Sequence, residues 1–233
     1  YCVWAPDQRG YNLSVKPEGI KSYAIDKLGM DIIGLIDAAG VDKAYIVGHD
    51  WGAGVTWWLV DNFPERIYKA VTMNVPHGLV MQKHLKSSFT QLLRSWYIFF
   101  FQIPWLPEFL LKIKGHSLLA RMLRESGQPD TFSSSDLEEY LAAWSQPNAV
   151  KSMINWYRAF VQKPPDMDPK KLIEVPMLLI WGVQDVALSR EMAQPSIDKC
   201  EDGKLVFLEQ ATHWVQHDEP QRVNKLLLEF LSS

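Results

Sequence analysis

The segment Gly48-His49-Asp50-Trp51-Gly52 carries the most reactive pattern in the sequence. It has the G-x-S-x-G spacing of a nucleophile elbow, a tight turn between a strand and a helix, with Asp50 in the position of the serine. Small residues on either side allow the strand and helix backbones to pass closely, and the turn then pushes the central side chain out above the sheet. A carboxylate there is suited to displacing a leaving group from an sp³ carbon, which gives an alkyl ester that water can hydrolyse. The alternative is that Asp50 only caps the following helix.

Two further residues could complete this chemistry. Asp185 lies just past the apolar run 177–180, and His213 lies just past the apolar run 205–208. Open α/β sheets place their sites at the carboxyl ends of the strands, so we expect both residues to lie near Asp50. His213 would deprotonate water, while Asp185 would orient its ring and stabilise the imidazolium. Either residue alone could be an ordinary loop residue, but the order nucleophile, acid, histidine is specific.

The elements that must position these residues alternate between strand and helix. Short apolar runs predict strands at 1–5, 44–47, 70–73, 177–180 and 205–208. Helical spacing and stop signals predict helices over 25–39, near 52–63, over 149–161, near 189–199 and from Pro220 onward. Alternation with short connections predicts an α/β fold with a mostly parallel sheet and helices on its faces.

The alternation stops between about residues 79 and 165, where several helical stretches and no convincing strand are found. We therefore predict three parts: a first part of the core at 1–78, an inserted all-helical cap at 79–168, and a second part of the core at 169–233. The apolar stretch 96–113 within the cap contains two prolines and a glutamate near its centre, which argues against a membrane-spanning helix.

The chain resembles the epoxide hydrolase branch of the α/β-hydrolase superfamily essentially from end to end. The motifs that carry the resemblance are residues 5–11 (Ala-Pro-Asp-Gln-Arg-Gly-Tyr), 48–52, 74–77 (Asn-Val-Pro-His), Trp181-Gly182 with Asp185, and His213-Trp214. These motifs would also suit haloalkane dehalogenases, which share the Asp nucleophile.

Two segments of the insertion favour an epoxide hydrolase. Residues 97–104 and 155–158 are similar to the two lid-tyrosine motifs of that family. The resemblance implies that Tyr97 and Tyr157 hydrogen-bond the epoxide oxygen and donate a proton as the ring opens. The chemistry supports this assignment, because a leaving alkoxide is a strong base that needs an acid, whereas a leaving halide does not.

The resemblance implies hydrolysis of an apolar epoxide to a vicinal diol through an ester on Asp50. The Trp51 backbone N–H would hold the ester oxyanion, and its side chain would form part of the pocket wall. Water and a small apolar epoxide are the expected partners, with no cofactor and no metal. A haloalkane dehalogenase, in which Trp51 would help to bind the halide, and a non-catalytic homologue acting as a binding module remain alternatives.

The family pattern also includes a His-Gly-x-Pro motif, whose loop supplies a second oxyanion donor, and this motif is not found in the sequence. The chain is therefore expected to begin at the family's fourth strand, with the first strands missing. Loss of one oxyanion donor costs on the order of 10²–10³ in rate, so we expect the chain as written to be weakly active or inactive.

Composition narrows the remaining function classes. A net charge of −3, from 24 Lys and Arg against 27 Asp and Glu, argues against a nucleic-acid-binding protein. Two cysteines cannot form a disulfide framework, so a reducing cytoplasmic location is expected. Peripheral membrane contact through the apolar insertion and a homodimer are left open.

Overall fold

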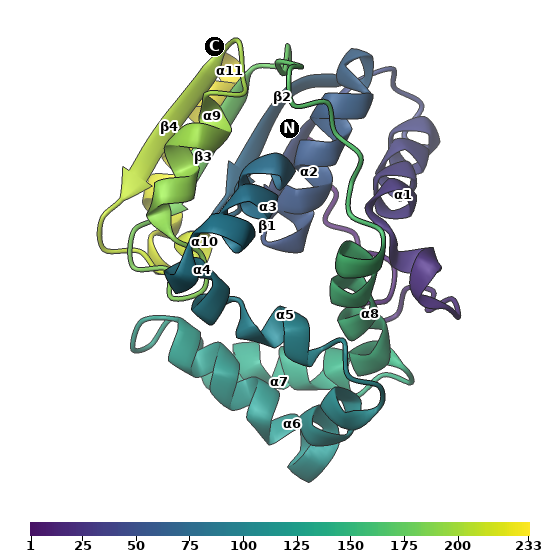
Figure 1. Ribbon diagram of the computed structural model, residues 1–233. Helices are drawn as coiled ribbons and strands as arrows, with labels where there is room; N and C mark the ends of the chain where they lie inside the picture. Colours follow the sequence, from purple (N-terminus) through teal and green to yellow (C-terminus); the bar gives the residue numbers. More distant parts are fainter.

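Four parallel strands form the centre of the molecule, in a computed structural model that describes residues 1–233. Their order in the sheet is their order in the chain, and every neighbouring pair is parallel (Figure 1). The predicted α/β class with a parallel sheet is confirmed. The strands are β1 (Ala44–His49), β2 (Ile67–Met73), β3 (Met177–Gly182) and β4 (Gly203–Leu208).

Two apolar clusters cover the two faces of the sheet, and β3 contributes to both. Its alternate residues Met177, Leu179 and Trp181 belong to the larger cluster, while Leu178 and Ile180 belong to the smaller one. All five are at most 1% exposed, which explains why a continuous apolar run rather than an alternating pattern marks this strand.

Helices on each face also contribute to these clusters. The larger cluster includes residues of α1 (Ile25–Ala38), α2 (Trp51–Asn62) and α9 (Ala193–Ile197). The smaller cluster includes residues of α10 (Val215–Asp218) and α11 (Pro220–Ser232). Short 3₁₀ helices lie at Ile20–Tyr23, Pro64–Arg66 and Arg190–Met192.

The strand predicted at residues 1–5 is wrong. These residues have no regular secondary structure and make no backbone hydrogen bond, and Val3 is 81% exposed. An apolar run becomes a strand only where a neighbour satisfies its N–H and C=O groups, and β1 pairs only with β2. The expectation that strands of the family fold are missing from the chain stays a prediction.

Six helices lie between β2 and β3, and Figure 1 shows α5, α6 and α7 set apart from the sheet. We call residues 78–162, which span these helices, the cap. Its helices are α3 (Gly78–Ser87), α4 (Phe89–Arg94), α5 (Trp96–Phe100), α6 (Leu106–Ser126), α7 (Ser134–Trp144) and α8 (Ala149–Gln162). Helix α6 is interrupted by non-helical backbone at Ile113–His116. The predicted domain boundaries at 78/79 and 168/169 stay predictions.

A nearly buried ion pair connects two parts of the cap. Arg158 of α8 pairs with Glu108 of α6 at 2.5 Å, and it also donates to the backbone carbonyls of Phe101 and Ile103 at 2.8 Å. These bonds satisfy a charge that would be costly to bury alone, and they fix the turn between α5 and α6 on α8. None of the helices is both long enough and apolar enough to cross a membrane.

Candidate active site

Asp50 is the single residue between the end of β1 and the start of α2. Its backbone is strained, with φ 49° and ψ −125°, a conformation that non-glycine residues adopt only when their surroundings impose it. Gly48 shows why the turn needs a small residue, because a Cβ there would lie 2.4 Å from the backbone oxygen of Gly52 and from Oγ1 of Thr56. The Asp50 side chain makes no capping hydrogen bond to α2, so helix capping does not explain this residue.

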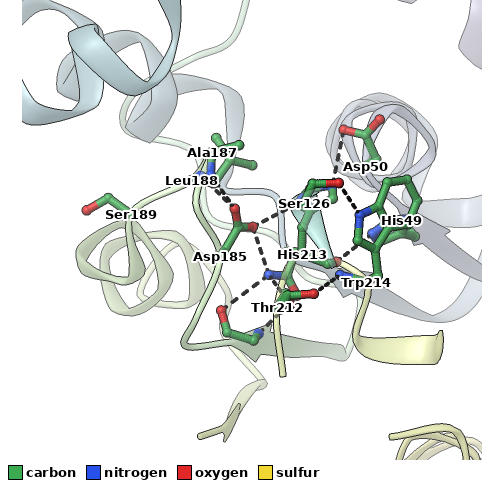
Figure 2. A network of polar contacts seen from close by, with 12 residues as sticks. His49, Asp50, Ser126, Asp185, Ala187, Leu188, Ser189, Thr212, His213 and Trp214 are labelled. Carbon is green, nitrogen blue, oxygen red and sulfur yellow. Dashed lines mark hydrogen bonds and ion pairs between the residues drawn. The ribbon is translucent and has the colours of Figure 1, made fainter. Parts of the chain in front are cut away.

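The imidazole of His213 lies between two carboxylates (Figure 2). Its Nδ1 is 2.7 Å from Oδ2 of Asp185, which is a short hydrogen bond. Its Nε2 is 3.6 Å from Oδ1 of Asp50, within ion-pair distance but too far for a hydrogen bond. The sequence predicted these three residues to converge, and the fold places them together.

Asp185 is fully buried and fully hydrogen-bonded. Its Oδ1 accepts from the backbone N–H groups of Ala187 and Leu188 at 2.7 and 2.8 Å, and its Oδ2 accepts from the Asn74 amide at 2.9 Å as well as from His213. Four donors compensate the loss of water around a side chain that is 0% exposed.

Asn74 is a site residue to which sequence analysis gave no role. It directly follows β2, has a positive φ of 54°, and is fully buried. Its Oδ1 accepts from the Gly182 N–H at 3.0 Å, so the side chain connects the ends of β2 and β3 and holds Asp185 in place. Asn74 belongs to the 74–77 motif that carries the resemblance, which marked the segment as part of the family pattern. Only the fold shows which residues Asn74 contacts. Each of the four strands is thus followed by one member of the group: Asp50, Asn74, Asp185 and His213.

Asp50, Asp185 and His213 shift the pKa values of one another. Burial alone would lower the pKa of His213, but Asp185 and then Asp50 outweigh it and raise the pKa to about 10. Burial would raise the pKa of Asp50, yet the His213 imidazolium holds this pKa below the usual range. The Asp50 side chain also keeps 44% of its surface accessible. At neutral pH both carboxylates are therefore ionised and His213 is positively charged.

His49 fixes the backbone of His213. Its Nε2 is 2.8 Å from the carbonyl oxygen of His213, which can only accept, so the ring donates from Nε2. The other nitrogen, Nδ1, then accepts from the side-chain amide of Gln216 at 3.2 Å. Burial, followed by the positive charge of His213, lowers the pKa of His49 to about 4, which keeps this bridge neutral.

A cavity of about 100 Å³ lies between the elbow and the cap. Asp50 and Trp51 line it from the core, Tyr97 of α5 and Tyr157 of α8 line it from the cap, and Asp50 is its only charged lining residue. Trp51 lies edge-on to Tyr157, with ring centroids 4.9 Å apart, and the two tyrosine rings are 5.7 Å apart. The apolar lining includes Trp57, Trp58, Val75, Met81, Phe160 and Met167.

Both phenols line the same cavity as Asp50, and neither ionises easily. Burial, followed by the negative charge of Asp50, raises the pKa of Tyr97, and the same two causes raise the pKa of Tyr157. The two groups are therefore protonated hydrogen-bond donors at neutral pH. A cavity of this kind can present one nucleophilic carboxylate and two proton donors to an apolar molecule.

A larger, open hollow of about 590 Å³ lies between residues 6–15 and α1, away from these groups. Its charged side chains are paired with their neighbours: Arg9 binds Asp31 at 2.6 Å, and Asp7 accepts from Asn12 at 2.9 Å. It therefore presents no free nucleophile or base.

Comparison with known proteins agrees with this geometry. The model of the alpha/beta hydrolase fold family matches residues 1–220. The chain belongs to this family. It is 43% identical to the AB hydrolase superfamily protein YfhM of Bacillus subtilis, over all of this chain and 81% of that protein. It is 39% identical to epoxide hydrolase 1 of Caenorhabditis elegans, over 99% of this chain and 58% of that protein.

The fold of this α/β hydrolase is also close to a solved one. A crystal structure of an epoxide hydrolase from Bacillus megaterium in complex with an inhibitor superimposes with a TM-score of 0.89 at 28% identity, covering 97% of this chain and 82% of that chain. The resemblance to the epoxide hydrolase branch is confirmed by these relatives. The roles of Asp50, Trp51, Tyr97, Tyr157, Asp185 and His213 stay predictions.

The charge on His213 gives the stability of the protein a specific pH dependence. The folded pKa of His213, about 10, lies above its value of about 6.5 in an unfolded chain. The stabilisation is therefore complete below pH 6.5 and is lost as the pH rises toward 10, with a slope of about 1.4 kcal/mol per pH unit. Urea unfolding between pH 7 and 9 should show this slope, and a His213→Gln variant should lack that part of it. Equal slopes in the two proteins would show that His213 is neutral in the folded state.

Proposed function

We propose that the protein hydrolyses an apolar epoxide to a vicinal diol through an alkyl ester on Asp50. The observation that carries this proposal is the apposition of one carboxylate and two protonated phenols across an apolar cavity. The names of the epoxide hydrolases among its relatives point to the same reaction. Because the chain spans only 58% of the Caenorhabditis elegans enzyme, the activity of the whole protein is part of the proposal.

The first step forms the ester. A carboxylate oxygen of Asp50 attacks one carbon of the epoxide from below, and the bond between that carbon and the ring oxygen breaks. The ring oxygen takes a proton from Tyr97 or Tyr157, so a neutral hydroxyl group and a tyrosinate are formed. The strained turn and the N-terminal end of α2 hold the carboxylate in the cavity while its charge is consumed.

Ester formation prepares the base for the second step. The ester removes the negative charge of Asp50, which is one of the two charges that hold the proton on His213. The imidazolium proton can then pass to the tyrosinate, which restores the phenol and leaves His213 neutral. Because the resting imidazolium supplies this proton, the net charge of the site does not change.

The second step releases the diol. Neutral His213 takes a proton from water, and the resulting hydroxide attacks the carbonyl carbon of the ester. The Trp51 backbone N–H stabilises the oxyanion, since it follows the nucleophile at the start of α2. Collapse breaks the bond to the alkoxide, which takes up the proton of the attacking hydroxyl group, and leaves ionised Asp50 beside protonated His213. Asp185 remains ionised throughout and stabilises the imidazolium.

A base-deficient variant should trap the ester. Replacement of His213 by Gln leaves Asp50 free to attack but removes the base for hydrolysis. Incubation with styrene oxide should therefore increase the mass of the intact protein by the mass of one epoxide molecule, with the adduct on the peptide that contains Asp50. One turnover is enough for this test, so it does not depend on a high turnover rate.

The control for the trap is the double variant Asp50→Asn/His213→Gln, which should remain unmodified. Circular dichroism and thermal unfolding of both variants check that they are folded. A folded His213→Gln protein that remains unmodified, or that carries the adduct on another residue, would contradict the proposed nucleophile.

The two tyrosines separate an epoxide hydrolase from a haloalkane dehalogenase. The double variant Tyr97→Phe/Tyr157→Phe keeps the aromatic packing but removes both proton donors, so diol formation should fall by about 10²–10⁴. Release of bromide from a bromoalkane needs no acid and should change little. Equal diol formation by the variant and the parent protein would show that the phenols do not protonate the oxygen, and bromide release exceeding diol formation in the parent would favour the dehalogenase.

A further inference from the structure

Helix α4 and the residue that follows it bury polar side chains, while α4 and α5 expose apolar ones. Gln91 and Ser95 are fully buried, and the Gln91 amide donates to Ser95 Oγ at 2.8 Å and to the Ala187 carbonyl at 2.9 Å. The Gln91 carbonyl oxygen accepts from the N–H of Ser189 at 3.0 Å. The polar groups of this segment are therefore used internally, in the reverse of the usual arrangement of a surface helix.

The outward side of the same segment is aromatic and aliphatic. The exposed residues follow one another at steps of three or four positions along α4 and α5 and continue into the start of α6, which are successive in the cap (Figure 1). We call this set the aromatic ridge: Phe89 (74% exposed), Leu93 (57%), Trp96 (58%), Phe99 (49%), Trp105 (75%) and Phe109 (61%). Large apolar side chains gathered in this way mark an interaction surface.

The charge around the ridge differs in sign from that of the protein. Residues 78–120 contain five basic residues and one acidic residue, a net charge of +4, whereas the remaining residues carry −7. The single acid, Glu108, is already paired with Arg158 at 2.5 Å. The five basic residues are all exposed, and they precede, interrupt and follow the ridge along the chain: Lys83, Lys86, Arg94, Lys112 and Lys114.

We propose that the aromatic ridge and its basic neighbours bind the surface of an anionic lipid bilayer. Tryptophan and phenylalanine beside lysine and arginine are the composition of segments that lie in the membrane interface. Basic residues near the surface are attracted to anionic lipids. A second copy of the chain fits less well, because a two-fold contact through the ridge would bring two surfaces of charge +4 together. The ridge would lie in the interface of the bilayer, with its basic neighbours at the lipid headgroups.

The ridge is adjacent to the cavity. Tyr97 and Ile98 line the cavity from α5, between Trp96 and Phe99, which are exposed. If the proposed function holds, a bilayer contact at α5 places the cavity beside the phase into which an apolar epoxide partitions. The membrane proposal itself rests on the ridge and its charge, and it does not need the reaction.

Flotation with vesicles tests this surface. The full chain should float with vesicles made of equal parts phosphatidylglycerol and phosphatidylcholine, bind phosphatidylcholine vesicles more weakly, and lose the difference at high salt. A Trp96→Gln/Phe99→Gln variant should bind about tenfold more weakly for each side chain replaced. A Lys83→Gln/Lys86→Gln variant, which leaves the apolar residues intact, should bind the anionic vesicles about fivefold more weakly for each lysine replaced.

The matched control is Leu228→Gln, which replaces an exposed apolar side chain (56%) on α11 and should bind as the parent does. Thermal unfolding checks that the variants are folded. If the aromatic variant is not folded, the lysine variant still tests the proposal. The proposal is overturned if the parent protein binds neither kind of vesicle, or if the lysine variant binds anionic vesicles as tightly as the parent does. It is also overturned if sedimentation velocity finds a dimer that dissociates in the aromatic variant and vesicles bind neither protein. Diol formation plays no part in these measurements, so this proposal and the proposed function fail independently.

Discussion

The positive charge on His213 holds two carboxylates together at the carboxyl edge of the sheet. Asp185 could not be buried without this partner and three further donors, and the same positive charge lowers the pKa of Asp50 against the effect of its burial. The arrangement needs four strand ends in one register, with Asn74 binding both Asp185 and the backbone of Gly182. The parallel sheet supplies this register, and the glycine positions around the turns allow the backbones to approach closely enough.

The same charge balance explains how one histidine can be a resting acid and also the base of the proposed reaction. With its pKa near 10, His213 in the resting site is a poor base. In the proposed reaction, neutralisation of Asp50 by the substrate removes part of the attraction for the proton, so the base is generated only when there is an ester to hydrolyse. His49 supports this role from the other side, because its neutral ring holds the His213 carbonyl without adding a charge. In the proposed reaction, the two cap phenols complete the balance by supplying the proton that the ring oxygen needs.

Local patterns were sufficient to predict the sheet strands and the three residues Asp50, Asp185 and His213, because each follows its own apolar run. Position in the sheet then follows from the parallel topology. The roles of Asn74 and His49 were not predicted, because each depends on a contact with a residue more than a hundred positions away. The apolar run at 1–5 has the composition of a strand, but composition does not reveal whether a strand partner exists.

The cap illustrates the same limit. The lid tyrosines were placed through a resemblance, and only the fold shows that α5 and α8 bring their rings to 5.7 Å. The apolar composition of the cap was visible, but which of its residues are buried was not: Gln91 turns inward because the 187–189 backbone offers it partners, and Ser95 accepts a hydrogen bond from Gln91. Predictions from periodicity assume that apolar residues face the core. Here a buried network of polar hydrogen bonds leaves the apolar residues of the same segment on the surface.

The path of the water oxygen tests the central claim most directly. In one turnover in ¹⁸O-labelled water, with protein in excess over the epoxide, hydrolysis through an ester transfers the labelled oxygen to the carboxyl group of Asp50 and an unlabelled protein oxygen to the diol. Mass spectrometry of the peptide that contains Asp50 should therefore show one ¹⁸O atom, while the first diol formed remains unlabelled. A labelled diol together with an unlabelled Asp50 peptide would mean that water attacks the epoxide directly, and would contradict the assignment of Asp50 as the nucleophile.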